Sequence, residues 1–153
     1  MEELCDLSVR GLEELIDYQQ YPVAAAERST LARRSLGVGY IGLAHYLAKN
    51  KVKYDDPEAW KLVHDLTEAF QSYLLKTSNQ IAKEKGACEY FDHTKYSDGL
   101  LPIDTYKKDV DDIVPNVLNY DWDTLRNDIK THGLRHSTPV SYTHLTLPTS
   151  VPV

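Results

Sequence analysis

The 153-residue chain has few cysteines and no long apolar stretch, and each absence excludes a class of protein. Its two cysteines, Cys5 and Cys88, lie far apart without a Cys-x-x-Cys pair. Neither a disulfide framework nor a zinc site is indicated, and a reducing, cytoplasmic compartment is expected. No apolar run approaches the roughly 18 residues that a membrane helix needs, and no secretion leader opens the sequence. We therefore expect no membrane partner.

Basic residues are also in the minority. Lysine and arginine number 17 against 23 aspartates and glutamates, which gives a net charge of -6. Binding to a phosphate backbone needs clustered positive charge, so no nucleic-acid partner is expected. With 42% apolar and 26% charged residues, the composition is that of one globular domain rather than of a disordered tail.

Several apolar patterns with helical spacing lie along the chain. The first predicts a helix over residues 2–20, which ends before Pro22 because the residue preceding a proline is pushed out of the α region. Its apolar face consists of Cys5, Val9, Leu12 and Ile16. A short strand or turn is expected over residues 36–38, and further helices over residues 24–34, 40–50, 105–113 and 122–132. Asp121 should cap the last helix and Gly133 should end it.

The strongest helical signal covers residues 57–85. Asp56 is a favoured cap, Pro57 suits the first helical position, and Gly86 closes the pattern. Such a helix is about 43 Å long, whereas a globule of about 140 residues is roughly 37 Å across. The helix outruns the body that should cover it, which suggests that it lies across a larger protein. The expected fold class is a mainly α fragment with one or two short strands.

One glycine motif is a candidate nucleotide site. The segment Gly37-Val-Gly39-Tyr-Ile-Gly42 matches the dinucleotide fingerprint, and Asp55 lies about where a ribose-binding acid should follow. The fingerprint works only when a buried strand feeds the glycine turn, and Arg33 and Arg34 do not suit such a strand. We expect a tight packing turn here, and a small nucleotide-binding protein that uses residues 37–42 remains an alternative.

Other candidate residues have ordinary structural explanations. His132 and His136 are separated by the helix-ending Gly133 and have no third ligand nearby, so no metal site is expected. Three acids resemble a calcium loop without its glycine and closing glutamate: Asp109, Asp111 and Asp112. Cys5 lies on an apolar helix face, and Cys88 follows a helix end without a basic pair beside it. No catalytic, cofactor-binding or metal-ligating residue is predicted.

The character of the sequence changes after Thr138. The run Pro139-Val-Ser-Tyr-Thr-His-Leu-Thr-Leu-Pro-Thr149 has no helical period, no charge and two prolines. It resembles the translation of a sequencing-library transposon adapter. We therefore expect residues 1–138 to be the natural part of the chain and residues 139–153 to be a non-native, unstructured tail.

Several phrases within residues 1–138 together resemble one protein family. They are Asp17-Tyr-Gln-Gln-Tyr-Pro22, Arg33-Arg-Ser-Leu-Gly-Val-Gly39, Tyr46-Leu-Ala-Lys49, Lys83-Glu-Lys-Gly-Ala-Cys88, Leu101-Pro-Ile-Asp-Thr-Tyr-Lys-Lys-Asp109 and Trp122-Asp-Thr-Leu-Arg-Asn-Asp-Ile-Lys-Thr-His-Gly-Leu-Arg-His-Ser-Thr138. By this resemblance the chain is identified as an internal fragment of the large, or alpha, subunit of bacterial class I ribonucleoside-diphosphate reductase.

The resemblance implies part of a ten-stranded α/β barrel. For the whole subunit it implies thiyl-radical reduction of ribonucleoside diphosphates to deoxyribonucleoside diphosphates for DNA synthesis. It also implies ATP and deoxynucleotide effectors, thioredoxin or glutaredoxin as reductant, a second large subunit, and a small (beta) subunit with a di-iron tyrosyl radical.

The family's functional residues should lie outside this chain. The radical and redox cysteines should precede residue 1, and the loop that grips the substrate phosphates should begin shortly after Thr138. Residues 1–138 would then be scaffold, without cofactors and inactive alone. A standalone helical protein-interaction module is the other alternative.

Overall fold

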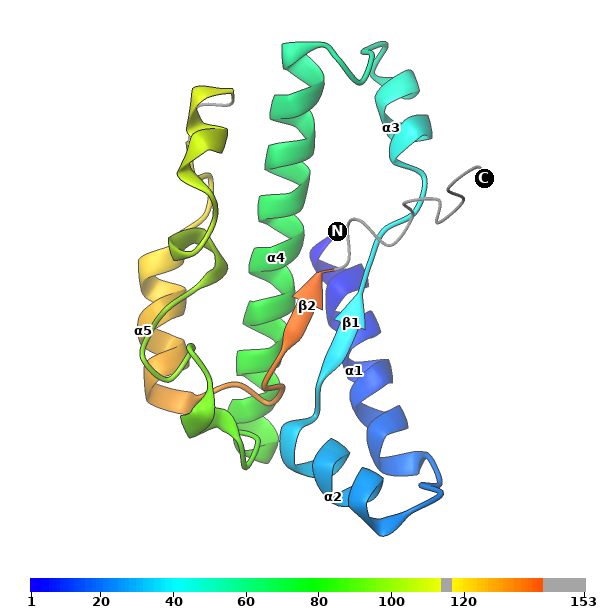
Figure 1. The fold of residues 1–153 in the computed structure, drawn as a ribbon, viewed down its shortest axis with the longest axis vertical. Coiled ribbons are helices and arrows are strands. Elements are labelled where there is room, and N and C mark those ends of the chain that lie inside the picture. Colours follow the sequence, from blue (N-terminus) through cyan, green and yellow to red (C-terminus); the bar gives the residue numbers. More distant parts are fainter. Residues whose placement is uncertain (114–116, 142–153) are drawn as a thin grey trace, which may run out of the picture.

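The computed structural model describes residues 1–113 and 117–141, and helices dominate them (Figure 1). The main elements are α1 (Glu2–Tyr18), α2 (Ala24–Arg33), β1 (Leu36–Val38), α3 (Leu43–Lys49), α4 (Pro57–Lys85), α5 (Trp122–His132) and β2 (Pro139–Ser141). Between α4 and α5 the chain forms the short 3₁₀ helices η1 (Phe91–His93), η2 (Pro102–Asp104) and η3 (Lys108–Asp112). The prediction of a mainly α chain with short strands is confirmed.

Helix α4 is the central element, with α1 and α5 packed against it (Figure 1). It begins with Pro57, as predicted, and ends at Gly86, whose φ of 89° suits glycine. The side chain of Asp56 does not cap it, contrary to the prediction. Instead, Oδ2 of Asp56 accepts the backbone N–H of Lys53 at 2.8 Å, so this carboxylate stabilises the turn before the helix.

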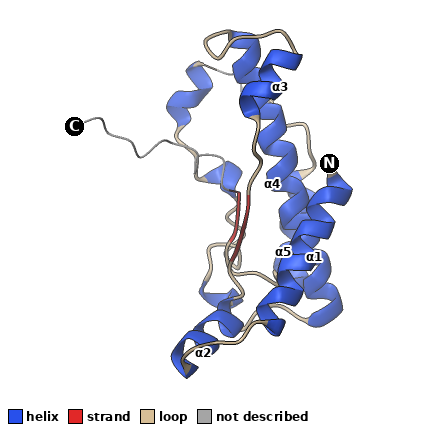
Figure 2. Cartoon of the chain, turned by 90° about the vertical axis from the view of Figure 1, so that its right-hand side faces the viewer, coloured by secondary structure: helices blue, strands red, loops and turns tan. Residues whose placement is uncertain are grey.

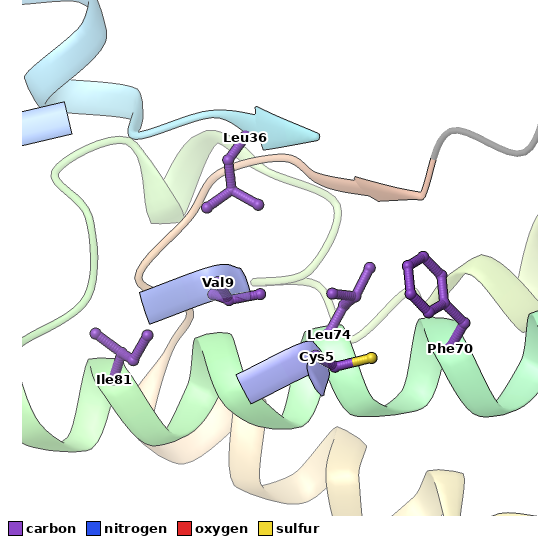
Figure 3. Packing of buried hydrophobic residues seen from close by; sticks show 6 residues of the cluster. All are labelled: Cys5, Val9, Leu36, Phe70, Leu74 and Ile81. Atoms are coloured by element: carbon purple, nitrogen blue, oxygen red, sulfur yellow. The ribbon is translucent and has the colours of Figure 1, made fainter. Parts of the chain in front are cut away.

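Two apolar clusters fix the neighbours of α4. The first joins α1, β1 and α4 through Cys5, Val9, Leu36, Phe70, Leu74 and Ile81. Figure 3 shows Val9 of α1 lying between Leu36 of β1 and the α4 residues. The second joins α4 to α5 and to the segments before and after α5, through Leu75, Leu101, Trp122, Leu125, Ile129 and Leu134. Burial of one such side chain contributes roughly 1.5–3 kcal/mol, so these clusters hold the helices together.

Strands β1 and β2 form a parallel pair in which Leu36 faces Pro139 and Val38 faces Ser141. Figure 2 shows the pair beside α1 and α4, which contact β1 and β2 respectively. The expected unstructured tail is therefore wrong for Pro139–Ser141. Pairing with β1 satisfies backbone groups there, and a proline is tolerated as the first residue of a strand. Residues 142–153 lie outside the described residues, so for them the expectation stays a prediction.

Two predicted helices were too long. The helix expected over residues 40–50 begins at Leu43, after Gly42 in the left-handed conformation. Residues 105–113 do not form an α-helix, and only Lys108–Asp112 is regular, as η3. Three aspartates within this segment are poor helix formers with like charges, which favours the shorter 3₁₀ turn. In the described part of the chain, no helix is long and apolar enough to cross a membrane.

Candidate functional site

Glu13 of α1 is 1% exposed and lies at the centre of a buried ion-pair cluster. Arg34 approaches both of its carboxylate oxygens, with Nη2 2.8 Å from Oε1 and Nε 2.9 Å from Oε2. Arg135 donates from Nε to Oε1 at 2.7 Å, and Nε2 of His136 lies 3.1 Å from Oε2. Here the ion-pair cluster means Glu13, Asp17, Arg34, Ser78, Arg135 and His136. It links α1, α4 and the residues that precede both strands.

Arg34 enters the ion-pair cluster from an unusual backbone conformation. It caps the end of α2 in the left-handed conformation, with φ 50° and ψ 39°. A non-glycine residue in this region costs on the order of 1–3 kcal/mol, so the surrounding contacts must hold it there. Besides Glu13, the guanidinium binds Asp17 through two bonds, Nη1 to Oδ1 at 2.9 Å and Nη2 to Oδ2 at 2.8 Å.

His136 is fully buried and its partners define its tautomer. The Glu13 carboxylate can only accept, so Nε2 of His136 carries the hydrogen. Nδ1 then accepts from the Ser78 hydroxyl at 2.9 Å, and the Ser78 oxygen accepts the backbone N–H of His136 at 3.2 Å. Burial lowers the pKa of His136 and outweighs the opposing effect of Glu13, so the ring is neutral near pH 7.

Glu13 remains ionised in this enclosure. Burial alone would raise its pKa, but hydrogen bonds from His136, Arg34 and Arg135 together hold the pKa well below its usual range. Both carboxylate oxygens are occupied by these donors. The geometry therefore suits a structural tie rather than general acid or base catalysis.

The glycine motif of residues 37–42 does not form the predicted tight packing turn at its last position, Gly42. Gly37 lies within β1, and Gly42 precedes α3 with φ 92°. A Cβ at Gly42 would meet nothing within 4 Å, so the backbone conformation rather than close packing explains this glycine. The expected absence of nucleotide binding stays a prediction.

The other candidate histidine, aspartate and cysteine residues from the sequence do not form a common site. His132 is exposed at the end of α5, whereas His136 belongs to the ion-pair cluster. Asp111 accepts from the Tyr106 hydroxyl at 2.8 Å and is exposed. Cys5 and Cys88 are free and buried, and burial raises the pKa of both thiols. Within the described ranges, no group of His, Cys, Asp and Glu could hold a metal ion.

A second buried carboxylate ties the loop before α5 to α4. Glu68 is 6% exposed and accepts from Trp122 Nε1 at 2.9 Å and from the backbone N–H of Asn119 at 2.8 Å. Beside it lies a mainly apolar cavity of about 660 Å³, whose walls include Leu47, Trp60, Val63, Ile103 and Leu118. The sequence pattern did not indicate Glu68, because nothing local marks its partners some 50 residues away.

Comparison with known proteins shows the family of this chain. Residues 1–148 match the sequence profile described as "Ribonucleotide reductase, barrel domain". The chain belongs to this family. The match includes residues 139–148, which the sequence pattern assigned to a tail, and so contains strand β2.

Several reductase alpha subunits are close relatives. The ribonucleoside-diphosphate reductase subunit alpha of Haemophilus influenzae is 60% identical over 131 residues, which cover 86% of this chain and 17% of the relative. The ribonucleoside-diphosphate reductase 1 subunit alpha of Escherichia coli is 56% identical over 123 residues, which cover 80% of this chain and 16% of the relative. The subunit alpha of Enterobacteria phage T4 is 46% identical over 136 residues, which cover 89% of this chain and 18% of the relative. The chain thus spans about one sixth of the length of these curated relatives.

In this reductase barrel domain, the ion-pair cluster lies at the amino-terminal ends of the strands. Arg34 comes just before β1, and His136 comes just before β2. The cluster therefore links the segments that enter the two strands to α1 and α4.

Proposed function

We propose that this chain is a scaffold segment of a ribonucleoside-diphosphate reductase alpha subunit. The parent enzyme reduces ribonucleoside diphosphates to deoxyribonucleoside diphosphates for DNA synthesis. The observation that carries the scaffold role is the closed ion-pair cluster: Glu13 has both oxygens occupied, and the cluster ties two parallel strands to α1 and α4. The family match and the high identity to alpha subunits support the parent activity.

The segment forms part of the wall of a ten-stranded α/β barrel. Parallel strands need a long crossover, and α3, α4 and α5 lie between β1 and β2 in the sequence. In the part of the chain that the structure describes, β1 and β2 pair only with each other. Their outer edges would pair with further strands of the parent barrel, since unpaired edges are avoided in stable sheets.

The thiol chemistry belongs to the rest of the subunit. Thiyl-radical reduction requires a thiol at the substrate and a second pair that supplies electrons, and two cysteines cannot fill three roles. Cys5 packs in the core between α1 and α4, and Cys88 is buried after α4. The parent would supply these thiols and the ATP and deoxynucleotide effector sites. Its partners would be a di-iron beta subunit, a second alpha subunit, and thioredoxin or glutaredoxin in the cytoplasm.

A chimaeric enzyme tests the proposal. Residues 1–138 replace the matching segment of the Escherichia coli alpha subunit, and deoxynucleotide formation is measured with the beta subunit and a dithiol. We expect activity from the chimaera and none from the isolated 153-residue chain; the unaltered subunit is the control. A cooperatively folded but inactive chimaera would contradict the scaffold role, and so would activity from the isolated chain.

A further inference from the structure

Helix α1 carries a second apolar face that the described chain leaves open. Its large members are Leu4, Leu7, Leu15 and Tyr18, which are 68%, 60%, 55% and 86% exposed. Their spacings of three, eight and three residues, with Gly11 between Leu7 and Leu15, place them on one side of the helix. We call Leu4, Leu7, Gly11, Leu15 and Tyr18 the outer stripe.

The outer stripe differs from scattered surface hydrophobics. Single exposed apolar residues are normal, whereas a contiguous apolar surface marks an interaction site. No charged residue interrupts the stripe, because the charged side chains of α1 lie beside it. Arg10 binds Glu84 at 2.7 Å, and Glu14 binds Lys85 at 2.5 Å, so these charges are directed towards α4.

Gly11 gives the stripe a definite shape. A glycine inside a helix is roughly 0.5–1 kcal/mol less favourable than alanine. The backbone does not require it, since Gly11 is not among the residues with positive φ, and a Cβ there would meet nothing within 4 Å. Leu7 and Leu15 stand one turn before and one turn after it. The result is a notch of the kind that receives a side chain from a packed helix.

We propose that the outer stripe is the docking face for an apolar helix of the same alpha-subunit polypeptide, from the part outside these 153 residues, and that this helix inserts a bulky apolar side chain at Gly11. The inference rests on the proposed function, because it requires a longer parent chain. This chain covers 17% of the Haemophilus influenzae relative, so most of that polypeptide remains to supply the helix. A second copy fits less well, because each copy carries a net charge of -6 and would repel the other.

Filling the notch provides the test. Gly11→Leu is compared with Glu3→Leu, which adds a leucine to α1 at an exposed position one turn before Leu7 and away from the notch at Gly11. Both variants are made in the 153-residue chain and in a chimaera in which residues 1–138 replace the matching segment of the Haemophilus influenzae alpha subunit. In the isolated chain neither variant should lower Tm. In the chimaera Gly11→Leu should lower Tm by several degrees, whereas Glu3→Leu should leave it unchanged.

Three outcomes would overturn the inference. The first is equal Tm for the two chimaeric variants. The second is a concentration-dependent dimer of the 153-residue chain that Gly11→Leu abolishes, since this would assign the face to a second copy. For the third, the 153-residue chain and the remainder of the alpha subunit are expressed as separate polypeptides and co-purified. If the remainder retains the Gly11→Leu chain as well as it retains the Glu3→Leu chain, the inference is wrong. Reductase activity enters none of these readouts, so an inactive chimaera counts against the proposed function alone.

Discussion

Nη2 of Arg34 lies 2.8 Å from Oε1 of Glu13, and the two side chains are only 5% and 1% exposed. This pair joins the turn before β1 to helix α1. Arg135 and His136, which precede β2, form hydrogen bonds with the same Glu13 carboxylate. Buried charges are tolerated only when each is fully partnered, because removal from water is costly for an isolated ion. The fold is therefore sensitive to the loss of any one partner.

Neutralising Glu13 should show this sensitivity. Glu13→Gln keeps the side-chain shape but leaves Arg34 and Arg135 without the central negative charge. We expect the free energy of unfolding to fall by about 3–5 kcal/mol, measured by urea denaturation with far-UV circular dichroism. Glu14→Gln is the matched control, because the Glu14 side chain is 70% exposed and its pair with Lys85 is at the surface. Its effect should stay below about 1 kcal/mol, and equal losses would contradict the assignment.

The same cluster predicts how stability depends on pH. Burial lowers the pKa of His136 in the folded chain, whereas the unfolded chain titrates near the ordinary value of 6.5. Below that pH the unfolded state binds a proton that the folded state does not, so stability falls as the pH decreases until the folded pKa is reached. Glu13, whose folded pKa is also lowered, adds a further loss below its ordinary value of 4.5.

Urea midpoints at pH 7, 6 and 5 would measure the histidine contribution. His136→Asn removes the titrating ring while offering an amide to the same partners, so the decline from pH 7 to pH 5 should become shallower. His132→Asn, at the exposed end of α5, is the control and should keep the decline of the parent chain. An unchanged decline in His136→Asn would show that the titrating group lies elsewhere.

The helices were predictable because their signals are local. Each signal lies within or beside the helix that it defines. These signals are the apolar period of α1, Pro57 and Gly86 at the ends of α4, and Asp121 before α5. Asp121 indeed accepts the N–H of Thr124 at 2.9 Å. The ends of α3 and η3 were less predictable, since short helices depend on their surroundings more than on propensity.

The ion-pair cluster could not be predicted in the same way. Glu13 follows Leu12 of the apolar face, but its partners Arg34, Arg135 and His136 are 21, 122 and 123 residues away. By sequence, Arg33 and Arg34 argue only against a buried strand, although Arg34 is the buried partner of Glu13. The pairing of Pro139–Ser141 with β1 is likewise a long-range contact that no local pattern specifies.

Gly133 should be the glycine least tolerant of substitution at a helix end. It has φ 74°, and a Cβ there would lie 2.6 Å from Cβ of Ala87. Gly86 has φ 89° and ψ 155°, a region open essentially to glycine alone, but there is open space around its would-be Cβ, so Gly86→Ala isolates the backbone strain of about 1–3 kcal/mol. Gly133→Ala should lower the unfolding free energy by roughly 1–3 kcal/mol more, because it adds a steric overlap. Urea denaturation checks this, and Ala87→Gly in the Gly133→Ala background should recover part of the loss.

Glu68 should control the position of Trp122. Glu68→Gln retains one acceptor oxygen, whereas the carboxylate accepts from Trp122 Nε1, from both nitrogens of Asn119 and from the backbone N–H of Tyr120. Leaving a buried donor unpaired costs about 1–3 kcal/mol. We expect lower stability and a red-shifted Trp122 fluorescence, recorded in a Trp60→Phe background. An unshifted spectrum would indicate that packing alone positions the indole.

The two halves of α4 should differ in their resistance to opening. Between Glu68 and Ala82 the helix contributes a nearly continuous set of buried residues, whereas between Trp60 and Thr67 its side chains are exposed or half-buried. Four of the latter, Trp60, Val63, His64 and Thr67, line the 660 Å³ cavity. Amides in a segment with few buried contacts exchange through low-energy local openings. Hydrogen exchange followed by mass spectrometry should therefore show faster exchange in the amino-terminal half of α4 in the isolated chain. Val63→Leu, which adds apolar volume beside the cavity, should slow that exchange, and exposed Gln80→Leu should not. Equal protection along the whole helix would show that the fragment covers α4 without help from a larger protein.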